Sequence, residues 1–115
     1  MKIDVRFRGL EASDSFREHV RRRVHFQMSR FGGAVRSVVV TIGDINGPKG
    51  GVDKRCQVTL RGSRLGPLTI EDLSADVYSA LDMALERAAR AAGRDIERTR
   101  YARREDAIWR ISVDA

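Results

Sequence analysis

Four arginines near the C-terminal third of the chain recur at the spacing of an α-helix. With successive residues placed about 100° apart, Arg87, Arg94 and Arg98 fall within a narrow wedge, and Arg90 lies just beside it. Such a row would follow one edge of a helix for about 16 Å, a length that matches several phosphates along a nucleic-acid backbone. The alternative is a solvated face whose arginines pair with carboxylates of the same helix, which is the usual role of a charge run.

Residue types that serve catalysis or metal binding are also present, but their spacing favours structural roles. His19 and His25 would lie about 120° apart on a helix, so they do not form an i,i+4 metal pair. Cys56 falls on the apolar side of an alternating segment, which predicts a buried side chain rather than a nucleophile. The glycine-rich stretch at residues 46–51 lacks the spacing of a phosphate-binding loop and predicts an exposed loop. We therefore expect no enzymatic activity, no small-molecule substrate, no metal and no cofactor.

The charge balance of the chain indicates a polyanionic partner. The 115 residues include 22 Lys and Arg against 16 Asp and Glu, for a net charge of +6 and a pI near 10.4. An excess of this size in one small domain is typical of nucleic-acid-binding proteins. Residues 1–31 carry a net charge of +4 and residues 32–72 carry +2, whereas the remainder is neutral. A single cysteine and the lack of any apolar run of about 20 residues predict a cytoplasmic protein without a membrane partner.

Hydrophobic periodicity predicts the elements that position these residues. Alternating apolar and polar residues predict strands over residues 2–8, 36–44, 54–61 and 68–71. Apolar residues at helical spacing predict helices over residues 13–31 and 74–100. The order βαβββα indicates an α+β fold, in which a four-stranded mixed sheet carries both helices on one face. The polar faces of the strands would then collect Arg6, Arg8, Arg55 and Arg61 on the open side of the sheet.

Residues 101–115 form a C-terminal tail that differs from the domain predicted over residues 1–100. A charged linker precedes Trp109, Ile111 and Val113, which alternate as in a strand. Because three apolar side chains on one side of an extended segment are unfavourable in water, residues 108–113 are expected to dock as an extra strand. The acceptor would be the chain's own sheet or that of a neighbour, which would give a homodimer. The alternative is a disordered tail.

A short signature opens the second predicted helix and precedes the basic residues Arg87, Arg90 and Arg94. It has the form D-hydrophobe-Y-x-A-hydrophobe-D, with the members Asp76, Val77, Tyr78, Ala80, Leu81 and Asp82. Together with the opening strand, the first helix and residues 52–56, the signature resembles the short form of the ribosome hibernation promoting factor / ribosome-associated inhibitor family, also called sigma-54 modulation proteins. The resemblance covers residues 1 to about 100. The sequence departs from it in a longer loop at 46–51 and in the apolar residues of the tail.

The resemblance implies a non-enzymatic translation regulator. Family members bind the small ribosomal subunit in the channel used by mRNA and tRNA, and silence translation under stress or in stationary phase. By position, the resemblance implies contacts to ribosomal RNA for Arg87, Arg90, Arg94, Arg98, Arg21, Arg22, Arg23, Lys54 and Arg55. Two alternatives are a general double-stranded RNA-binding domain that uses the same surface, and a protein-interaction module that modulates an alternative sigma factor.

Overall fold

The elements follow one another in the order strand, helix, three strands, helix. The computed structural model describes residues 1–45, 53–63 and 65–114, and the last fourteen of these only as helical backbone. The elements are β1 (Lys2–Arg8), α1 (Asp14–Met28), the 3-10 helix η1 (Ser29–Ala34), β2 (Ser37–Asp44), β3 (Lys54–Arg61), β4 (Leu68–Ser74) and α2 (Val77–Asp114). The loop predicted at residues 46–51 lies outside the described residues.

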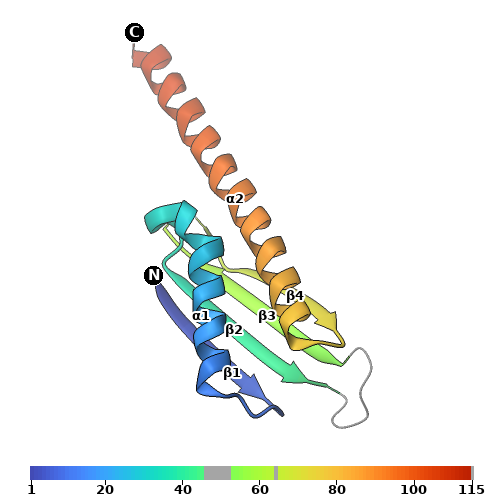
Figure 1. Cartoon of the computed structure of the whole chain (residues 1–115). Coiled ribbons are helices and arrows are strands. Elements are labelled where there is room, and N and C mark those ends of the chain that lie inside the picture. The colour runs from blue at the N-terminus through green and yellow to red at the C-terminus, as the bar shows by residue number, and fades with distance from the viewer. Residues whose placement is uncertain (46–52, 64, 115) are drawn as a thin grey trace.

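The four strands form one mixed sheet in the order β1-β2-β3-β4 (Figure 1). β1 and β2 are parallel, because α1 carries the chain from the end of one strand back to the start of the next. β2, β3 and β4 are antiparallel neighbours and form a meander. The predicted α+β fold and its βαβββα order are therefore confirmed.

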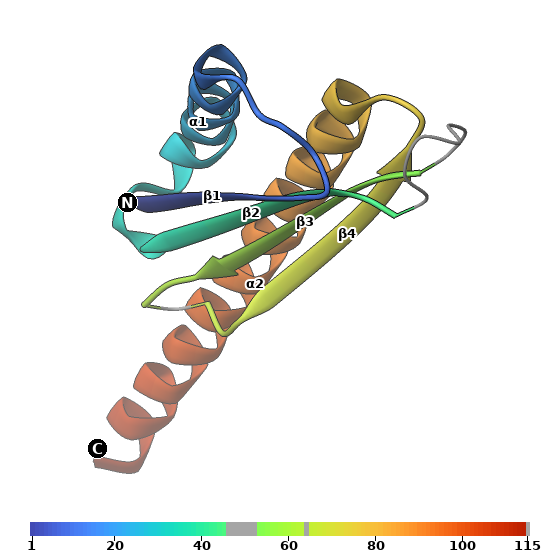
Figure 2. The same ribbon diagram turned by 90° about the horizontal axis from the view of Figure 1, so that it is seen from below.

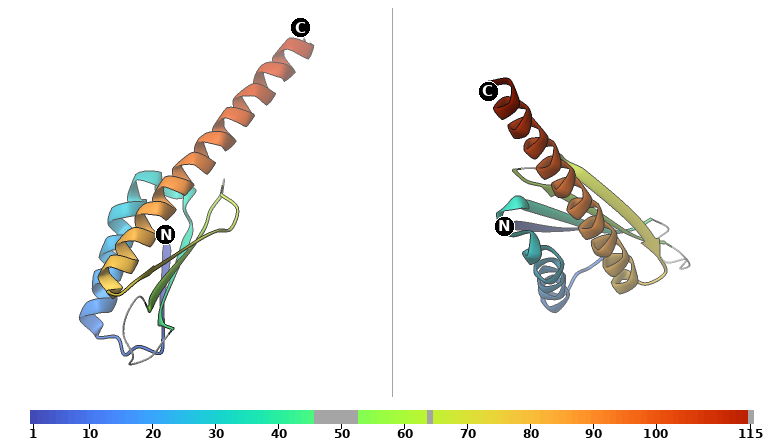
Figure 3. Two further views of the ribbon diagram at one scale, coloured as in Figure 1. Left: turned by 90° about the vertical axis from the view of Figure 1, so that its right-hand side faces the viewer. Right: turned by 90° about the horizontal axis from the view of Figure 1, so that it is seen from above.

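Both helices lie on the same face of the sheet and leave the other face open (Figure 3). The core between the two layers is aliphatic, since alternate residues of the strands and one stripe of each helix point into it. Its largest fully buried side chains include Val20, Val24, Met28, Val38, Val40, Ile42, Val58, Leu60, Leu81 and Leu85. This arrangement gives the protein two surfaces of different character, one helical and one made of strand side chains.

Polar side chains define where both helices begin. The Ser13 hydroxyl accepts a hydrogen bond from the Phe16 backbone N–H at 3.1 Å and caps α1. Asp76 does the same for α2, since its carboxylate accepts from the Ser79 N–H at 3.1 Å. α2 consequently begins at Val77 rather than at residue 74, and β4 runs to Ser74 rather than ending at residue 71.

α1 ends earlier than the periodicity predicts, and a more tightly wound 3-10 helix follows it. The α-helix stops at Met28, and η1 continues through Phe31 before Gly32, with φ of 55°, turns the chain toward β2. The returning chain passes close to the end of β3. A Cβ at Gly62 would overlap the carbonyl oxygen of Ala34, so this crossing requires glycine. The turn at Gly32 holds η1 beside the middle of α2, where Phe31 lies against Gly93.

The extra strand predicted over residues 108–113 is wrong, because α2 continues as one helix to Asp114 (Figure 1). No glycine or proline occurs after Gly93, and the segment is rich in Arg and also contains Ala, both of which favour helix. Extending an existing helix carries no nucleation cost, so this preference outweighs a short alternating pattern. The added strand was the predicted route to a homodimer, and the structure does not form it. Across the described residues, every helix lacks the long apolar stretch that a bilayer span requires.

Candidate nucleic-acid interface

The predicted arginine row lies on α2, and all four side chains are exposed. They differ in what they contact. Within the described part of the chain, neither Arg90 nor Arg94 takes part in an ion pair or a side-chain hydrogen bond. A guanidinium without an internal partner can give all of its donors to an external phosphate. These two residues are therefore the best placed of the row to bind an anion.

Arg87 is engaged within the protein. Its Nη1 lies 2.8 Å from Asp72 Oδ2 and 3.2 Å from the Glu71 carbonyl oxygen, so it ties α2 to β4. Arg98 makes a weaker contact, with its Nη2 at 3.2 Å from Asp95 Oδ1 one turn earlier on the same helix. That pair is exposed and of the kind that contributes little to stability, so Arg98 is easily released to another anion.

A groove between η1 and α2 extends the arginine row sideways. Its volume is about 430 Å³, and it is lined by Arg30, Phe31, Ala89, Arg90, Gly93, Arg94 and Glu97. An adjoining hollow adds Ile96 and Arg100. The Arg30 guanidinium stacks on the Phe31 ring, 4.8 Å from its centroid, which fixes the cation at the rim. We call this surface the η1–α2 groove.

The η1–α2 groove gathers four arginines around a single carboxylate, that of Glu97. Arg30 and Arg100 were not among the predicted site residues. Periodicity could not place Arg30, because the sequence predicts a continuous helix through residue 31, whereas the chain changes to a 3-10 helix and turns at Gly32. The Gly32-Gly33 pair was the available signal, since it marks where the chain folds back toward the second helix.

The three consecutive arginines of α1 divide between two roles. Arg21 and Arg22 are exposed. Arg23 is partly buried, and its Nε lies 3.2 Å from Asp82 Oδ1 on α2. Its guanidinium also lies 5.4 Å from the ring centroid of Phe26, a side chain that is 72% exposed. Arg23 thus joins the two helices, while Arg21 and Arg22 add to the positive potential of the helical surface.

The signature residues at the start of α2 make contacts that stabilise the fold. Asp76 caps the helix and Asp82 holds Arg23. The Tyr78 ring packs edge-on against Phe16 of α1, with ring centroids 5.1 Å apart. Ala80 and Leu81 are fully buried. The signature therefore fixes α2 against α1, and the arginines that follow it are placed by this packing.

Lys54 and Arg55 lie on opposite faces of the sheet, as neighbours on a strand must. Arg55 points to the open face, where its Nε lies 3.1 Å from Glu71 Oε1. Lys54 points to the helical side and lies between two carboxylates, 3.0 Å from Asp44 and 3.1 Å from Asp53. Neither residue reaches the η1–α2 groove, so the structure does not assemble the predicted site residues into one surface.

The Lys54 ammonium is an internal counter-ion. The hydrogen bonds that this ammonium donates to Asp44 and, with a smaller effect, to Asp53 raise its pKa above the ordinary value of 10.5. Asp53 is 1% exposed, and its Oδ1 has no hydrogen-bond partner in the structure. A buried carboxylate with a single bonded oxygen depends strongly on its cation. The charge of Lys54 is therefore used inside the fold.

Cys56 is fully buried near the start of β3, as its place in the alternating pattern predicts. Burial raises the pKa of its thiol to about 12, with a smaller contribution from the Asp72 carboxylate. A thiol of this kind stays protonated at neutral pH and is a poor nucleophile. Among the described residues, no three His, Cys, Asp or Glu side chains gather in a way that could hold a metal ion.

Sequence comparison relates most of the chain to one family. Residues 3–100 match the family described as sigma 54 modulation protein / S30EA ribosomal protein. A curated relative, the chloroplastic ribosome-binding factor PSRP1 of Spinacia oleracea, is 33% identical over 87 residues. The match covers 72% of this chain and 28% of the relative, so this chain spans only about a quarter of that protein's length.

Solved structures share the fold. The N-terminal domain of Thermus thermophilus Protein Y superposes with a TM-score of 0.67 at 23% identity, over 82% of this chain and 98% of that domain. A ribosomal subunit interface protein from Coxiella burnetii gives a TM-score of 0.66 at 15% identity, over 82% and 96% of the two chains. At these identities the likeness establishes the two-layer architecture that carries the arginines.

Proposed function

The chain belongs to the sigma 54 modulation protein / S30EA ribosomal protein family, a family of ribosome-associated proteins, and from this premise we propose that it binds ribosomal RNA of the small subunit. In this proposal the protein occupies the channel used by mRNA and tRNA and silences translation under stress or in stationary phase. It acts by occupying the channel and catalyses no reaction.

The η1–α2 groove is the observation that carries the proposal. It presents Arg30, Arg90, Arg94 and Arg100 against one carboxylate, and Arg90 and Arg94 have no internal partner among the described residues. Arginine binds phosphate through a planar fork of donors, and most contacts to nucleic acid are made to the backbone. The groove therefore suits RNA phosphates and does not require a particular base sequence.

Binding in the channel would silence translation by two physical effects. The body of the protein would exclude mRNA and tRNA by volume, and its arginines would occupy phosphates that line the path. mRNA and tRNA are also polyanions, but they cannot bind these arginines while the arginines hold ribosomal RNA. Affinity must then fall steeply with salt, because each phosphate contact releases a condensed counterion.

Co-sedimentation with purified small subunits at 50 and 200 mM KCl tests the proposal. The parent protein should bind at low salt and lose most of its affinity at high salt. Arg94→Glu should weaken binding about tenfold, whereas Arg36→Glu, an equal charge change at an exposed residue outside the groove, should change it less than threefold. Equal losses for the two variants would assign binding to net charge rather than to the groove.

Competition identifies the place on the subunit. Subunits already loaded with mRNA and tRNA should bind the protein at least tenfold less tightly, and the protein should inhibit synthesis of a reporter in a purified translation system. Binding to a mixed-sequence RNA duplex as tight as binding to the subunit would instead indicate a general double-stranded RNA-binding domain. Capture of a sigma factor without ribosome binding would indicate the interaction module.

A further inference from the structure

The open face of the sheet carries a second cluster of basic residues, on the opposite side of the protein from the η1–α2 groove. The cationic side chains on this face are Lys2, Arg6, Arg8, Arg55 and Arg61, and all five are exposed. Its acidic side chains among the described residues are Asp4 and Glu71, and Asp44, whose charge is balanced by Lys54, lies at its edge. The net charge of this face is therefore +3, half of the excess of the whole chain.

Internal pairing neutralises only two of these cations. Arg6 Nε lies 2.9 Å from Asp4 Oδ2, and Arg55 Nε lies 3.1 Å from Glu71 Oε1. Lys2, Arg8 and Arg61 take part in no ion pair with the other described residues. A face that served solubility alone would mix both signs evenly. This face instead keeps an uncompensated positive charge.

The unpaired cations lie at both ends of the face. Lys2 and Arg61 flank Ser37 in one cross-strand row, and Arg8 flanks Gly43 with Arg55 in another. Six residues of strand separate the two rows, a distance of about 20 Å. Phosphates recur every few ångströms along a nucleic-acid strand, so the two rows are far enough apart to contact several of them.

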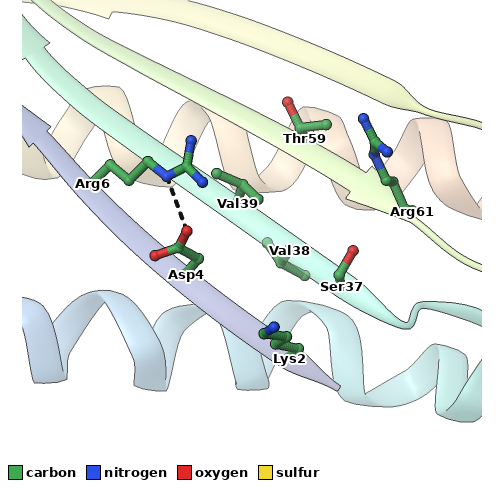
Figure 4. A pocket seen from close by; sticks show the side chains of 8 residues that line it. All are labelled: Lys2, Asp4, Arg6, Ser37, Val38, Val39, Thr59 and Arg61. Carbon is green, nitrogen blue, oxygen red and sulfur yellow. Dashed lines mark hydrogen bonds and ion pairs between the residues drawn. The ribbon is translucent and has the colours of Figure 1, made fainter.

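The surface between the two rows is hollowed and polar. Two adjoining hollows, of about 530 and 410 Å³, share Arg6, Val39 and Thr59 as lining residues. Figure 4 shows the first hollow, where Arg6, Thr59 and Arg61 stand on strands that cross in front of the helices. Hydroxyl and amide groups in this region can donate to sugar and phosphate oxygens. No aromatic residue belongs to the described part of this face, so stacked bases find no platform there.

From this arrangement we propose that the open sheet face is a second RNA-binding surface, which holds the sugar-phosphate backbone of a separate RNA segment. The protein then bridges two RNA segments, one on the η1–α2 groove and one on the sheet. A second copy of the chain is a poor occupant, because two such faces would meet with like charges. The inference rests on the proposed function in taking RNA as the ligand of both faces.

A two-RNA capture assay with the full chain tests the bridge. A biotinylated mixed-sequence RNA duplex is fixed to beads and saturated with protein, the beads are washed, and a fluorescent hairpin of equal helix length is added. The parent should retain the hairpin. Arg8→Glu/Arg61→Glu should still bind the bead RNA through the groove but retain at least fivefold less hairpin. The slope of log affinity against log salt for the hairpin should fall by about two in this variant.

Two further variants make the assay decisive. Asp4→Asn/Glu71→Gln removes the face's carboxylates and should increase hairpin retention at least twofold. Arg90→Glu/Arg94→Glu should also lose bridging, since it leaves only the sheet face. Full retention by the Arg8→Glu/Arg61→Glu variant would overturn the inference, because a dimer joined through its sheet faces, with both grooves free, would behave in that way. Failure of the parent to bind any RNA would overturn the proposed function as well, and binding only to phosphatidylglycerol vesicles would overturn both.

Discussion

The start of β3 and the middle of α2 use basic residues in opposite ways. At the start of β3, Lys54 lies between Asp44 and Asp53, and its charge balances a buried carboxylate. On α2, Arg90 and Arg94 face the η1–α2 groove with no internal partner among the described residues. A cation in the right family position is therefore not by itself a cation available to a ligand. Its neighbours decide whether it stabilises the fold or binds an anion.

Reversal of two groove charges should produce the largest effect on binding. Arg30→Glu/Arg94→Glu removes two charge-assisted contacts of about 1–2 kcal/mol each, so affinity for the small subunit should fall roughly 30-fold or more. Both side chains are exposed, and stability should change by less than about 0.5 kcal/mol. Fluorescence anisotropy with labelled protein measures the affinity and urea unfolding measures the stability. Unchanged affinity would remove the groove from the interface.

Removal of the Lys54 ammonium should produce the reverse result. Lys54→Met leaves Asp53 buried without its cation, so stability should fall, while subunit affinity should stay within twofold. The raised pKa of Lys54 gives the parent a stability contribution that is complete below pH 10.5 and is lost as the pH rises through the folded value. The variant should lack that part of the alkaline loss in urea unfolding. Weaker binding without lower stability would show that Lys54 contacts RNA.

Cys56 lies in the core beside neither surface, so its substitution should change stability without changing binding. Cys56→Ala should cost about 1–2 kcal/mol through a small cavity and leave subunit affinity unchanged. Native protein at pH 8 should not react with a disulfide reagent, whereas urea-unfolded protein should react at once. Burial raises the thiol pKa from 9.0 to about 12. The stability that comes from burying the protonated thiol is therefore present below pH 9 and is lost as the pH rises from 9 to about 12. Rapid reaction of the native thiol would contradict its burial.

The smallest effect is expected at the contact between the two helices. Asp82 is half exposed, so Asp82→Asn should cost only about 0.5 kcal/mol. The change also frees Arg23, which should strengthen subunit binding slightly, by less than about twofold. A large loss of stability would show that the Arg23–Asp82 pair determines how α1 and α2 pack.

Alternation and helical spacing predicted the fold well because each element has a consistent local pattern. The bounds of β1 and β3 coincide with their alternating runs, and the sheet order follows from the connections. The strand predicted in the tail was wrong because Trp109, Ile111 and Val113 fit a strand locally, while the helix formers around them extend α2. The roles of Arg87 and Lys54 could not be predicted, since their partners come from tertiary contacts. Arg30 was missed for a related reason, because its position depends on the turn at Gly32.

The length of α2 determines how the protein behaves as a particle. Its 38 residues span about 57 Å, and the helix runs past the end of the sheet (Figure 2). The principal extents are 68 × 24 × 17 Å and the radius of gyration is 17.6 Å, against about 13 Å for a compact domain of this length. Such a rod has a large friction coefficient, so a single copy should elute from a sizing column ahead of its 12.9 kDa mass and mimic a pair. Light scattering, which measures mass without reference to shape, gives its true stoichiometry in solution.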